Sequence, residues 1–261
     1  MAAIAIRIVA YAALAYLALP LVVLLGASVT ATSYLSFPPR GVTLAWYGRM
    51  LDDPSYLSAF ATSSLLAAAA TLAAVLLAIP AALAIARDRF PGRRLIAAIL
   101  MSPLILPHVV LGTALLQYGT MIGLTRSFGA LLVGHIVIIM PFVLRAVLPQ
   151  LNEEQRSLEE ASADLGAGPL ATFFFVTLPQ IRSGVVSGAM FAFISSWINV
   201  ELSIFNTTAE LTTIPVKLFN YVQYSVDPII AAVSSITILA AAAAIILLDL
   251  TLGLEVLSER R

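Results

Sequence analysis

The sequence predicts an all-α integral membrane protein with six transmembrane helices. Of its 261 residues, 61% are hydrophobic and only 11% are charged, whereas a soluble domain has about 25% charged residues. The mean hydropathy of +1.00 agrees with this assignment. The apolar residues also gather into long uncharged runs, and a run of about 20 residues can cross the hydrocarbon core of a bilayer as a helix.

The predicted spans follow these uncharged runs in chain order. The first run begins after Arg7 and exceeds twenty residues, whereas the apolar core of a signal peptide has only about 7 to 15, so a cleaved signal peptide is disfavoured. The third run contains Pro103 and Pro107, and the fourth contains Pro141. We place the spans at residues 8–30, 57–86, 95–118, 128–148, 183–205 and 228–250, in a single transmembrane domain covering residues 1–261.

Charge and cysteine content exclude several functions. The formal net charge is zero, so nothing indicates binding to nucleic acid. The chain has no cysteine, which excludes disulfides, thiolate metal sites and cysteine catalysis. It also lacks the G-x-x-x-x-G-K-[ST] loop that cradles ATP phosphates. We therefore expect no catalytic residue, no metal site and no cofactor bound by this chain; it is not predicted to be an enzyme.

The basic residues predict that both chain termini are cytoplasmic. If the termini share one side of the membrane, that side holds ten of the 14 Lys and Arg residues. Cytoplasmic loops carry the excess of positive charge. The ten are Arg7, Arg87, Arg89, Arg93, Arg94, Arg145, Arg156, Arg182, Arg260 and Arg261, and the four on the other side are Arg40, Arg49, Arg126 and Lys217.

The segment of residues 157–179 is unusual because it is both polar and patterned. Ser157 and Glu160 have the spacing of a capping box, which predicts that a short helix begins there. Gly166 can end this helix by adopting a positive φ. Pro169 suits the first position of a second helix. The segment therefore predicts two short helices joined by a hinge.

The first of these helices is predicted to be amphipathic and the second apolar. Three apolar residues repeat at helical spacing, and three polar residues lie on the other side. These are Leu158, Ala161 and Leu165 on the apolar side and Glu159, Ser162 and Asp164 on the polar side. The second helix is expected to continue from Leu170 to Thr177, until Pro179 interrupts it.

The same segment resembles the EAA loop of binding-protein-dependent ABC transporter permeases. That loop reads E-A-A-x-x-x-G, nine residues, then I-x-L-P, and this chain departs from it only at Ser162 and Val176. In the family, the loop is cytoplasmic and its first helix docks in a cleft on a separate ATP-hydrolysing subunit. The resemblance implies that residues 149–182 form such a coupling loop. The implied coupling residues are Glu160, Ala161, Ser162, Asp164, Leu165, Gly166 and Pro179.

Shorter matches extend the resemblance over most of the chain, to the second permease subunit of the spermidine/putrescine type. They lie at residues 44–47, 64–65, 102–107, 135–143 and 213–216. The implied fold is the type I ABC importer transmembrane domain in the bacterial cytoplasmic (inner) membrane, crossing it several times. The implied partners are a second homologous permease, a dimer of ATP-binding subunits that holds ATP and magnesium, an extracytoplasmic substrate-binding protein and membrane lipid.

Four residues are candidates for the substrate pathway: His108, Trp197, Asn199 and Glu201. Glu201 is predicted about four residues from the outer end of the fifth span, where a charge costs less than at the membrane centre; a paired or snorkelling carboxylate and a substrate contact both remain open. Asn199 can bind a solute or a neighbouring helix. His108 follows a proline and can be a ligand or a structural residue. His135 is interpreted as a packing residue.

The predicted substrate is polyamine-like or another small charged organic solute. In the spermidine/putrescine type, the residue after the third-span proline and the fifth-span stretch are often acidic, whereas this chain has His108, Ile198 and Asn199 there. A multiple cation needs carboxylates to offset its desolvation, so Glu201 would have to substitute. An anionic solute such as an aminophosphonate is the alternative. A secondary transporter, which would be expected to show a midplane ion site and repeated topology, and a structural membrane protein are less favoured.

Overall fold

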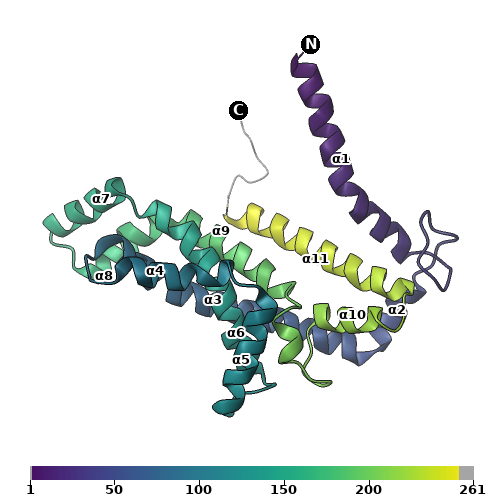
Figure 1. Cartoon of the computed structure of the whole chain (residues 1–261). Coiled ribbons are helices and arrows are strands. Elements are labelled where there is room, and N and C mark those ends of the chain that lie inside the picture. Colours follow the sequence, from purple (N-terminus) through teal and green to yellow (C-terminus); the bar gives the residue numbers. More distant parts are fainter. Residues whose placement is uncertain (1, 253–261) are drawn as a thin grey trace. The chain divides into compact units, whose positions relative to one another are not determined.

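The computed structural model describes the backbone of residues 2–252 and the side chains of residues 4–243. Every regular element within this part of the chain is helical (Figure 1). Two arginines counted in the orientation prediction, Arg260 and Arg261, lie outside the described residues. The all-α prediction is confirmed for the residues that the structure describes.

The chain divides into two compact units, which we describe separately. The terminal unit comprises Met1–Leu57 and Leu218–Arg261, and the central unit comprises Ser58–Lys217. Two helices, α3 (Pro54–Arg87) and α10 (Ile214–Val222), run across the division between the units. The prediction of one domain over residues 1–261 stays a prediction.

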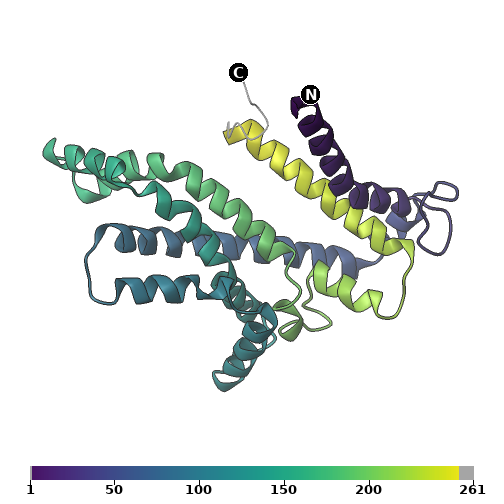
Figure 2. The ribbon, with the colours of Figure 1, turned by 45° about the horizontal axis from the view of Figure 1, so that its top comes forward.

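The terminal unit is built on three helices, α1 (Ala2–Ser28), α2 (Ala45–Asp52) and α11 (Pro228–Leu252). Helix α11 packs against both α1 and α2 (Figure 2). The indole Nε1 of Trp46 donates to the backbone oxygen of Thr30 at 2.9 Å. This buried hydrogen bond fixes α2 against the chain that leaves α1.

The central unit holds the remaining helices of the described chain. They are α4 (Arg93–Met101), α5 (His108–Met121), α6 (Phe128–Val147), α7 (Glu153–Asp164), α8 (Pro169–Thr172) and α9 (Leu178–Trp197), with short turns η1 (Ser102–Leu104), η2 (Leu148–Gln150), η3 (Phe173–Thr177) and η4 (Ser203–Phe205). Its main contact is between α6 and α9. A Cβ atom at Gly184 would lie 2.6 Å from the backbone oxygen of Ala146, and one at Gly188 would lie 2.9 Å from Cα of Val143. These glycines allow the two helix backbones to approach closely.

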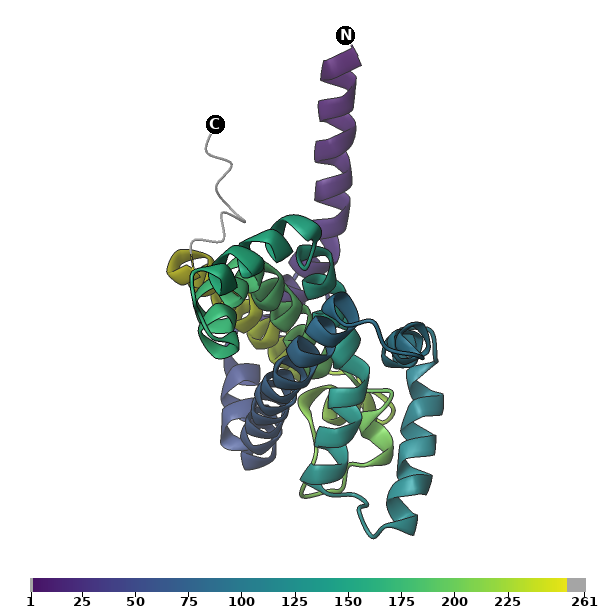
Figure 3. The ribbon, with the colours of Figure 1, turned by 90° about the vertical axis from the view of Figure 1, so that its left-hand side faces the viewer.

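The third predicted span, residues 95–118, is not one continuous helix. The structure has the pair Arg93–Leu104 and His108–Met121, bent by 107°. Figure 3 shows this change of direction, with α4 viewed nearly end-on and α5 lengthwise. Pro103 and Pro107 cause the break, because each lacks the N–H of a helical hydrogen bond and each disfavours helical geometry at the preceding residue.

The fifth predicted span, residues 183–205, ends earlier than expected and begins earlier too. Helix α9 stops at Trp197. It continues backwards through the π-helical turn η3 into α8, so that 169–197 is one apolar segment of 29 residues. The prediction that Pro179 interrupts the second loop helix is therefore wrong. The π turn widens the helix just before the proline, and Pro179 lies in the first turn of α9.

Four described helices are long and apolar enough to cross a membrane, and five if the bent pair counts as one span. The four overlap the first, second, fourth and fifth predicted spans, although the first prediction extends two residues beyond Ser28 and the fifth extends eight residues beyond Trp197. The sixth predicted span corresponds to α11, of which the shorter apolar part Pro228–Ala243 is counted separately. The number of six spans stays a prediction.

Candidate functional site

The first helix of the EAA-like loop, α7, begins five residues earlier than the capping box predicts. Asn152 is its N-cap, and the Asn152 side-chain oxygen accepts from the Gln155 amide at 2.9 Å. The predicted capping box is wrong: Ser157 Oγ donates back to the Glu154 oxygen at 2.7 Å, and the Glu160 carboxylate pairs with an arginine one turn earlier. Asparagine is as good an N-cap as serine, and here it takes that position first.

The end of α7 is as predicted. Gly166 has a φ of +87°, and its amide donates to the oxygen of Ala163 at 2.9 Å. The next amide, of Ala167, donates to the oxygen of Ser162 at 3.1 Å. These two bonds form a Schellman motif, which satisfies carbonyls that the helix leaves free and favours glycine at its left-handed position. Pro169 then begins α8, as predicted.

The side of α7 that faces the rest of the central unit is the polar one, and the leucines of the predicted apolar stripe are turned outward. Leu158 is 44% exposed and Leu165 is 90% exposed. Gln155 is buried, and the Glu159 side chain is only 18% exposed. The orientation follows from the partners that the neighbouring elements offer, since these partners are polar.

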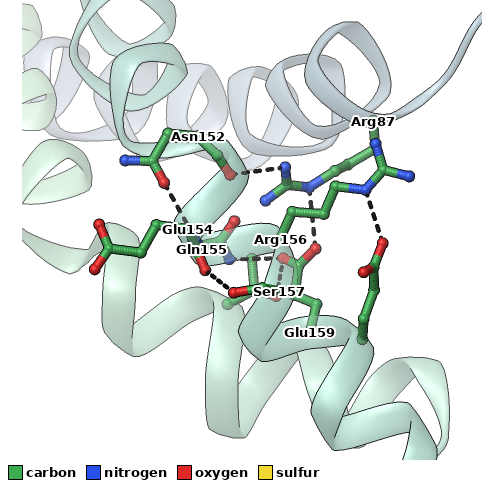
Figure 4. A network of polar contacts seen from close by, with 9 residues as sticks. Arg87, Asn152, Glu154, Gln155, Arg156, Ser157 and Glu159 are labelled. Atoms are coloured by element: carbon green, nitrogen blue, oxygen red, sulfur yellow. Dashed lines mark hydrogen bonds and ion pairs between the residues drawn. The ribbon is translucent and has the colours of Figure 1, made fainter.

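Figure 4 shows the polar network that receives this side of α7. Arg87 Nε, at the end of α3, lies 3.0 Å from Glu159 Oε2, and Arg87 Nη1 donates to the Asn152 oxygen at 3.2 Å. The other carboxylate oxygen, Glu159 Oε1, accepts from Gln155 Nε2 and from Thr177 Oγ1, each at 2.6 Å. One carboxylate therefore joins α3, α7 and η3. We refer to these five residues as the loop network.

Three of the four candidate pathway residues lie together in the central unit. His108 is the first residue of α5, directly after the bend. Asn199 Nδ2 lies 3.3 Å from His108 Nδ1, and Glu201 Oε2 lies 3.8 Å from the same nitrogen. Glu201 was predicted to lie inside the fifth span, but the structure places it in the turn between α9 and η4. Its side chain is 61% exposed.

The fourth candidate, Trp197, lies apart from this group. Its indole Nε1 donates to Ser64 Oγ at 3.3 Å, and its ring centroid lies 6.0 Å from that of Phe60. Both partners belong to α3. Trp197 therefore packs α9 on α3, and its part in the substrate pathway stays a prediction.

A second polar network centres on His135, which is fully buried. His135 Nδ1 lies 2.7 Å from Ser196 Oγ, and Nε2 lies 2.9 Å from Ser203 Oγ. The Ser203 hydroxyl donates to the backbone oxygen of Asn199 at 3.0 Å, so Ser203 is the acceptor for Nε2–H. A neutral imidazole then accepts at Nδ1 from Ser196. We call His135, Ser196, Ser203 and Asn199 the core network.

The core network holds the chain that follows α9. The Asn199 side-chain oxygen accepts from the Leu202 amide at 3.0 Å, and such side chain to backbone bonds compete with continuation of a helix. A Cβ atom at Gly112 of α5 would lie 3.0 Å from Cα of Leu202 and 3.2 Å from the oxygen of Glu201. Helix α5 therefore lies directly against this turn. The interpretation of His135 as a packing residue missed its two hydrogen bonds.

Sequence reasoning also missed Arg87 and Thr177 as partners of the loop. The only sequence signal for Thr177 is a hydroxyl within an otherwise apolar run. Arg87 enters the sequence-based predictions only as a basic residue that indicates orientation. Neither signal identifies Glu159 as the common partner, because the three residues lie far apart in the sequence.

The long apolar helices, the loop and the bent pair together define the transmembrane subunit of an ABC importer. The fold is shared with the crystal structure of a bacterial ABC transporter involved in the import of the acidic polysaccharide alginate, with a TM-score of 0.77, 15% identity and coverage of 95% of both chains. Residues 74–257 match the family model for the binding-protein-dependent transport system inner membrane component. The chain belongs to that family and is a multi-pass permease of the inner membrane.

Individual relatives are permeases as well. The chain is 34% identical over 203 residues to the putrescine transport system permease protein PotI of Escherichia coli, covering 75% of this chain and 72% of the relative. It is 28% identical over 237 residues to the spermidine/putrescine transport system permease protein PotC of Haemophilus influenzae, covering 90% and 91%. It is 27% identical over 177 residues to the molybdate/tungstate permease protein WtpB of Pyrococcus abyssi, covering 68% and 66%.

Proposed function

We propose that this chain forms half of the translocation pathway for a polyamine-like or other small charged organic solute in an ATP-driven importer. The observation that carries the proposal is the 34% identity to a permease named for putrescine. The exposed Glu201 carboxylate, placed beside His108 and Asn199, supports a cationic solute. A carboxylate accepts charge-assisted hydrogen bonds from an ammonium group, and several ammonium groups need such partners to offset desolvation.

We further propose the partners that such an importer uses. They are a dimer of ATP-binding subunits that holds ATP and magnesium, a second homologous permease and an extracytoplasmic substrate-binding protein, with this chain itself non-enzymatic. Both termini and residues 149–182 would then face the cytoplasm, as the distribution of Lys and Arg indicates, with six spans in all. Exposed apolar side chains on the loop, including Leu165 and Phe175, support docking on the ATP-binding subunit.

The proposed coupling residues have distinct structural settings. Gly166 ends α7 with a conformation that a side chain would strain. Glu160 lies on α7 and its side chain belongs to a more exposed ion pair. We propose that these two, with Ala161, Ser162, Asp164, Leu165 and Pro179, form the part of the loop through which ATP binding moves the permease.

An anionic solute is the second candidate, and the relative named for molybdate and tungstate is the observation in its favour. That relative is less similar and matches a smaller part of the chain than the two named for putrescine. The negative charge of Glu201 beside the proposed pathway also opposes an anion. We therefore favour the polyamine-like solute.

Uptake into proteoliposomes tests the solute. The permease is reconstituted with its partner permease, ATP-binding subunits and binding protein, and uptake of labelled putrescine and spermidine is compared with that of an aminophosphonate and of molybdate. We expect ATP-dependent uptake of a polyamine and its loss in Glu201→Gln. Anion uptake without polyamine uptake would refute the proposal.

Co-purification tests the coupling loop. The wild type is expected to bind the ATP-binding subunits, whereas Gly166→Asp, which strains the backbone, and Glu160→Lys, which reverses a charge, are expected to lose assembly or ATP-dependent uptake. Assembly of both variants with unchanged uptake would argue against this loop as the docking site.

A further inference from the structure

We propose that the ion pair between Arg87 and Glu159 is the contact that transmits movement of the coupling helix, α7, to the membrane helices. The inference deepens the proposed function and rests on docking of the loop on the ATP-binding subunit. It assigns both residues a positioning role, since neither needs to contact ATP or solute. Neither belongs to the set of coupling residues that the EAA-like pattern identifies.

The first argument is that α7 has little else on its inner side. Leu158 and Leu165 are turned outward, and the helix packs mainly against α8 and η3. Its polar contacts with other elements are made by Glu159, to Arg87 and Thr177, and by Ser162, whose hydroxyl lies 3.1 Å from Thr172 Oγ1 of α8. Gln155 supports the Glu159 carboxylate from within α7. The loop network therefore replaces the apolar packing that usually attaches a helix to its neighbours.

The second argument is where the partners lie. Arg87 ends α3, a helix of 34 residues, and Thr177 ends the π turn that leads into α9. Arg87 pairs with one oxygen of the Glu159 carboxylate, and Thr177 donates to the other. A displacement of Glu159 therefore acts at once on the last residue of α3 and on the residue that precedes α9.

The third argument comes from an internal comparison on the same helix. Arg156 Nε lies 3.0 Å from Glu160 Oε1, the same separation as in the pair between Arg87 and Glu159. The Arg156–Glu160 pair joins residues one turn apart, and its side chains are 42% and 65% exposed. Those of the other pair are 17% and 18% exposed and come from different helices. Of these two ion pairs, only the pair between Arg87 and Glu159 can transmit a movement between helices.

The test measures transport and ATP hydrolysis in the reconstituted complex. Glu159→Gln keeps the size of the side chain and removes its charge, and Arg87→Gln removes the opposite charge from the other helix with a shorter polar side chain. We expect both variants to assemble with the ATP-binding subunits and to hydrolyse ATP, but to transport at least about fivefold less solute per ATP. The double variant Arg87→Glu with Glu159→Arg is expected to recover a substantial part of this ratio, because it restores the ion pair in reverse.

Arg156→Gln is the matched control. It removes the arginine of an ion pair with the same N–O distance, and Arg156 is outside the proposed coupling set. This variant should leave the transport per ATP unchanged. Equal losses in Arg156→Gln and Glu159→Gln, or a normal ratio in Glu159→Gln, would overturn the proposal. If the wild type itself fails to bind the ATP-binding subunits, the proposed docking fails instead, so the two failures are distinguishable.

A second route covers variants that assemble poorly. The chain has no cysteine, so the double variant Arg87→Cys with Glu159→Cys offers its only two thiols for a short bifunctional thiol reagent. The uncoupled double variant should regain transport per ATP when the two positions are linked covalently. Successful cross-linking without recovery of that ratio would contradict the proposal that positions 87 and 159 stay in contact through the transport cycle.

Discussion

The loop network and the core network join the same kind of elements with opposite chemistry. Around Glu159, an ionised arginine and a carboxylate are linked at a position that keeps some exposure to solvent. Around His135, an imidazole and two hydroxyls are linked in a fully buried position on α6, α9 and η4. A charge costs little where solvent or an ion pair compensates it and much more in the membrane interior, and the two networks follow this rule.

The comparison also separates two tasks. The core network fixes a static feature, the turn that carries Asn199 and Glu201, and its members can be neutral. The loop network attaches a helix that has its apolar residues turned outward, and strong charge-assisted bonds are suited to an attachment without apolar packing. The predictions below measure this difference through the stability of the purified complex in detergent.

Replacement of His135 should have the largest effect. His135→Leu leaves the buried Ser196 hydroxyl without its acceptor and Ser203 without the donor to its oxygen, and an unsatisfied polar group in a protein interior costs about 1 to 3 kcal/mol. We expect a clear fall in the midpoint of thermal unfolding. His135→Gln keeps one donor and one acceptor and should lose less, so equal losses in both would show that shape, not hydrogen bonding, matters there.

Replacement of Glu159 should come second. Glu159→Leu leaves Arg87 without its counter-charge and Thr177 and Gln155 without their acceptor. Because the site keeps some solvent exposure, we expect the unfolding free energy to fall by about 1 to 2 kcal/mol. Hydrogen exchange should increase mainly at the amides of α7. A loss greater than that of His135→Leu would reverse the comparison.

Removal of one hydroxyl from the core network should have a smaller effect. Ser203→Ala takes away the acceptor of His135 Nε2–H and the donor to the Asn199 oxygen. Interhelical polar contacts in membranes average about 0.6 kcal/mol, so we expect a fall of about 1 kcal/mol in unfolding free energy. Hydrogen exchange at Leu202 should also increase. Unchanged exchange there would refute a role of this network in holding the turn.

Removal of Arg156 should have the smallest effect. An exposed ion pair one helical turn apart contributes about 0.3 to 0.5 kcal/mol. Arg156→Gln is therefore expected to unfold within about 0.5 kcal/mol of the wild type, and the difference should vanish at high salt, because screening affects exposed pairs most. A larger loss would show that the two ion pairs of α7 are equivalent.

Some local features of the fold were predictable from sequence, although the capping box at Ser157 and the helix interruption at Pro179 were not, and the long-range contacts were not predictable. The stop at Gly166 and the start at Pro169 depend on backbone geometry at those residues alone. The amphipathic pattern of α7 does not indicate which side faces inward, because hydrophobicity gives no information about Arg87 and Thr177 as partners. The two prolines that cause the bend, Pro103 and Pro107, lie within a continuous apolar run, and the length of that run predicts a single span.

The candidate site shows the same division. The position of His108 next to Asn199 and Glu201 required a bend and an early helix end at Trp197, which no pattern within one segment indicates. The family was recognisable from the loop because its motif is local. The partners of Glu159 became visible only once α3 and η3 were placed beside α7.

The π-helical turn η3 has a consequence for the length of the motif itself. Each residue turns an α-helix by about 100°, and a π turn is a single wider turn within an α-helix. A residue inserted or deleted between Gly166 and Val176 that η3 does not absorb would carry Thr177 around the helix axis, away from Glu159. The length of the nine-residue interval between Gly166 and Val176 therefore determines the direction in which Thr177 points. Insertions or deletions there should be tolerated far less than substitutions.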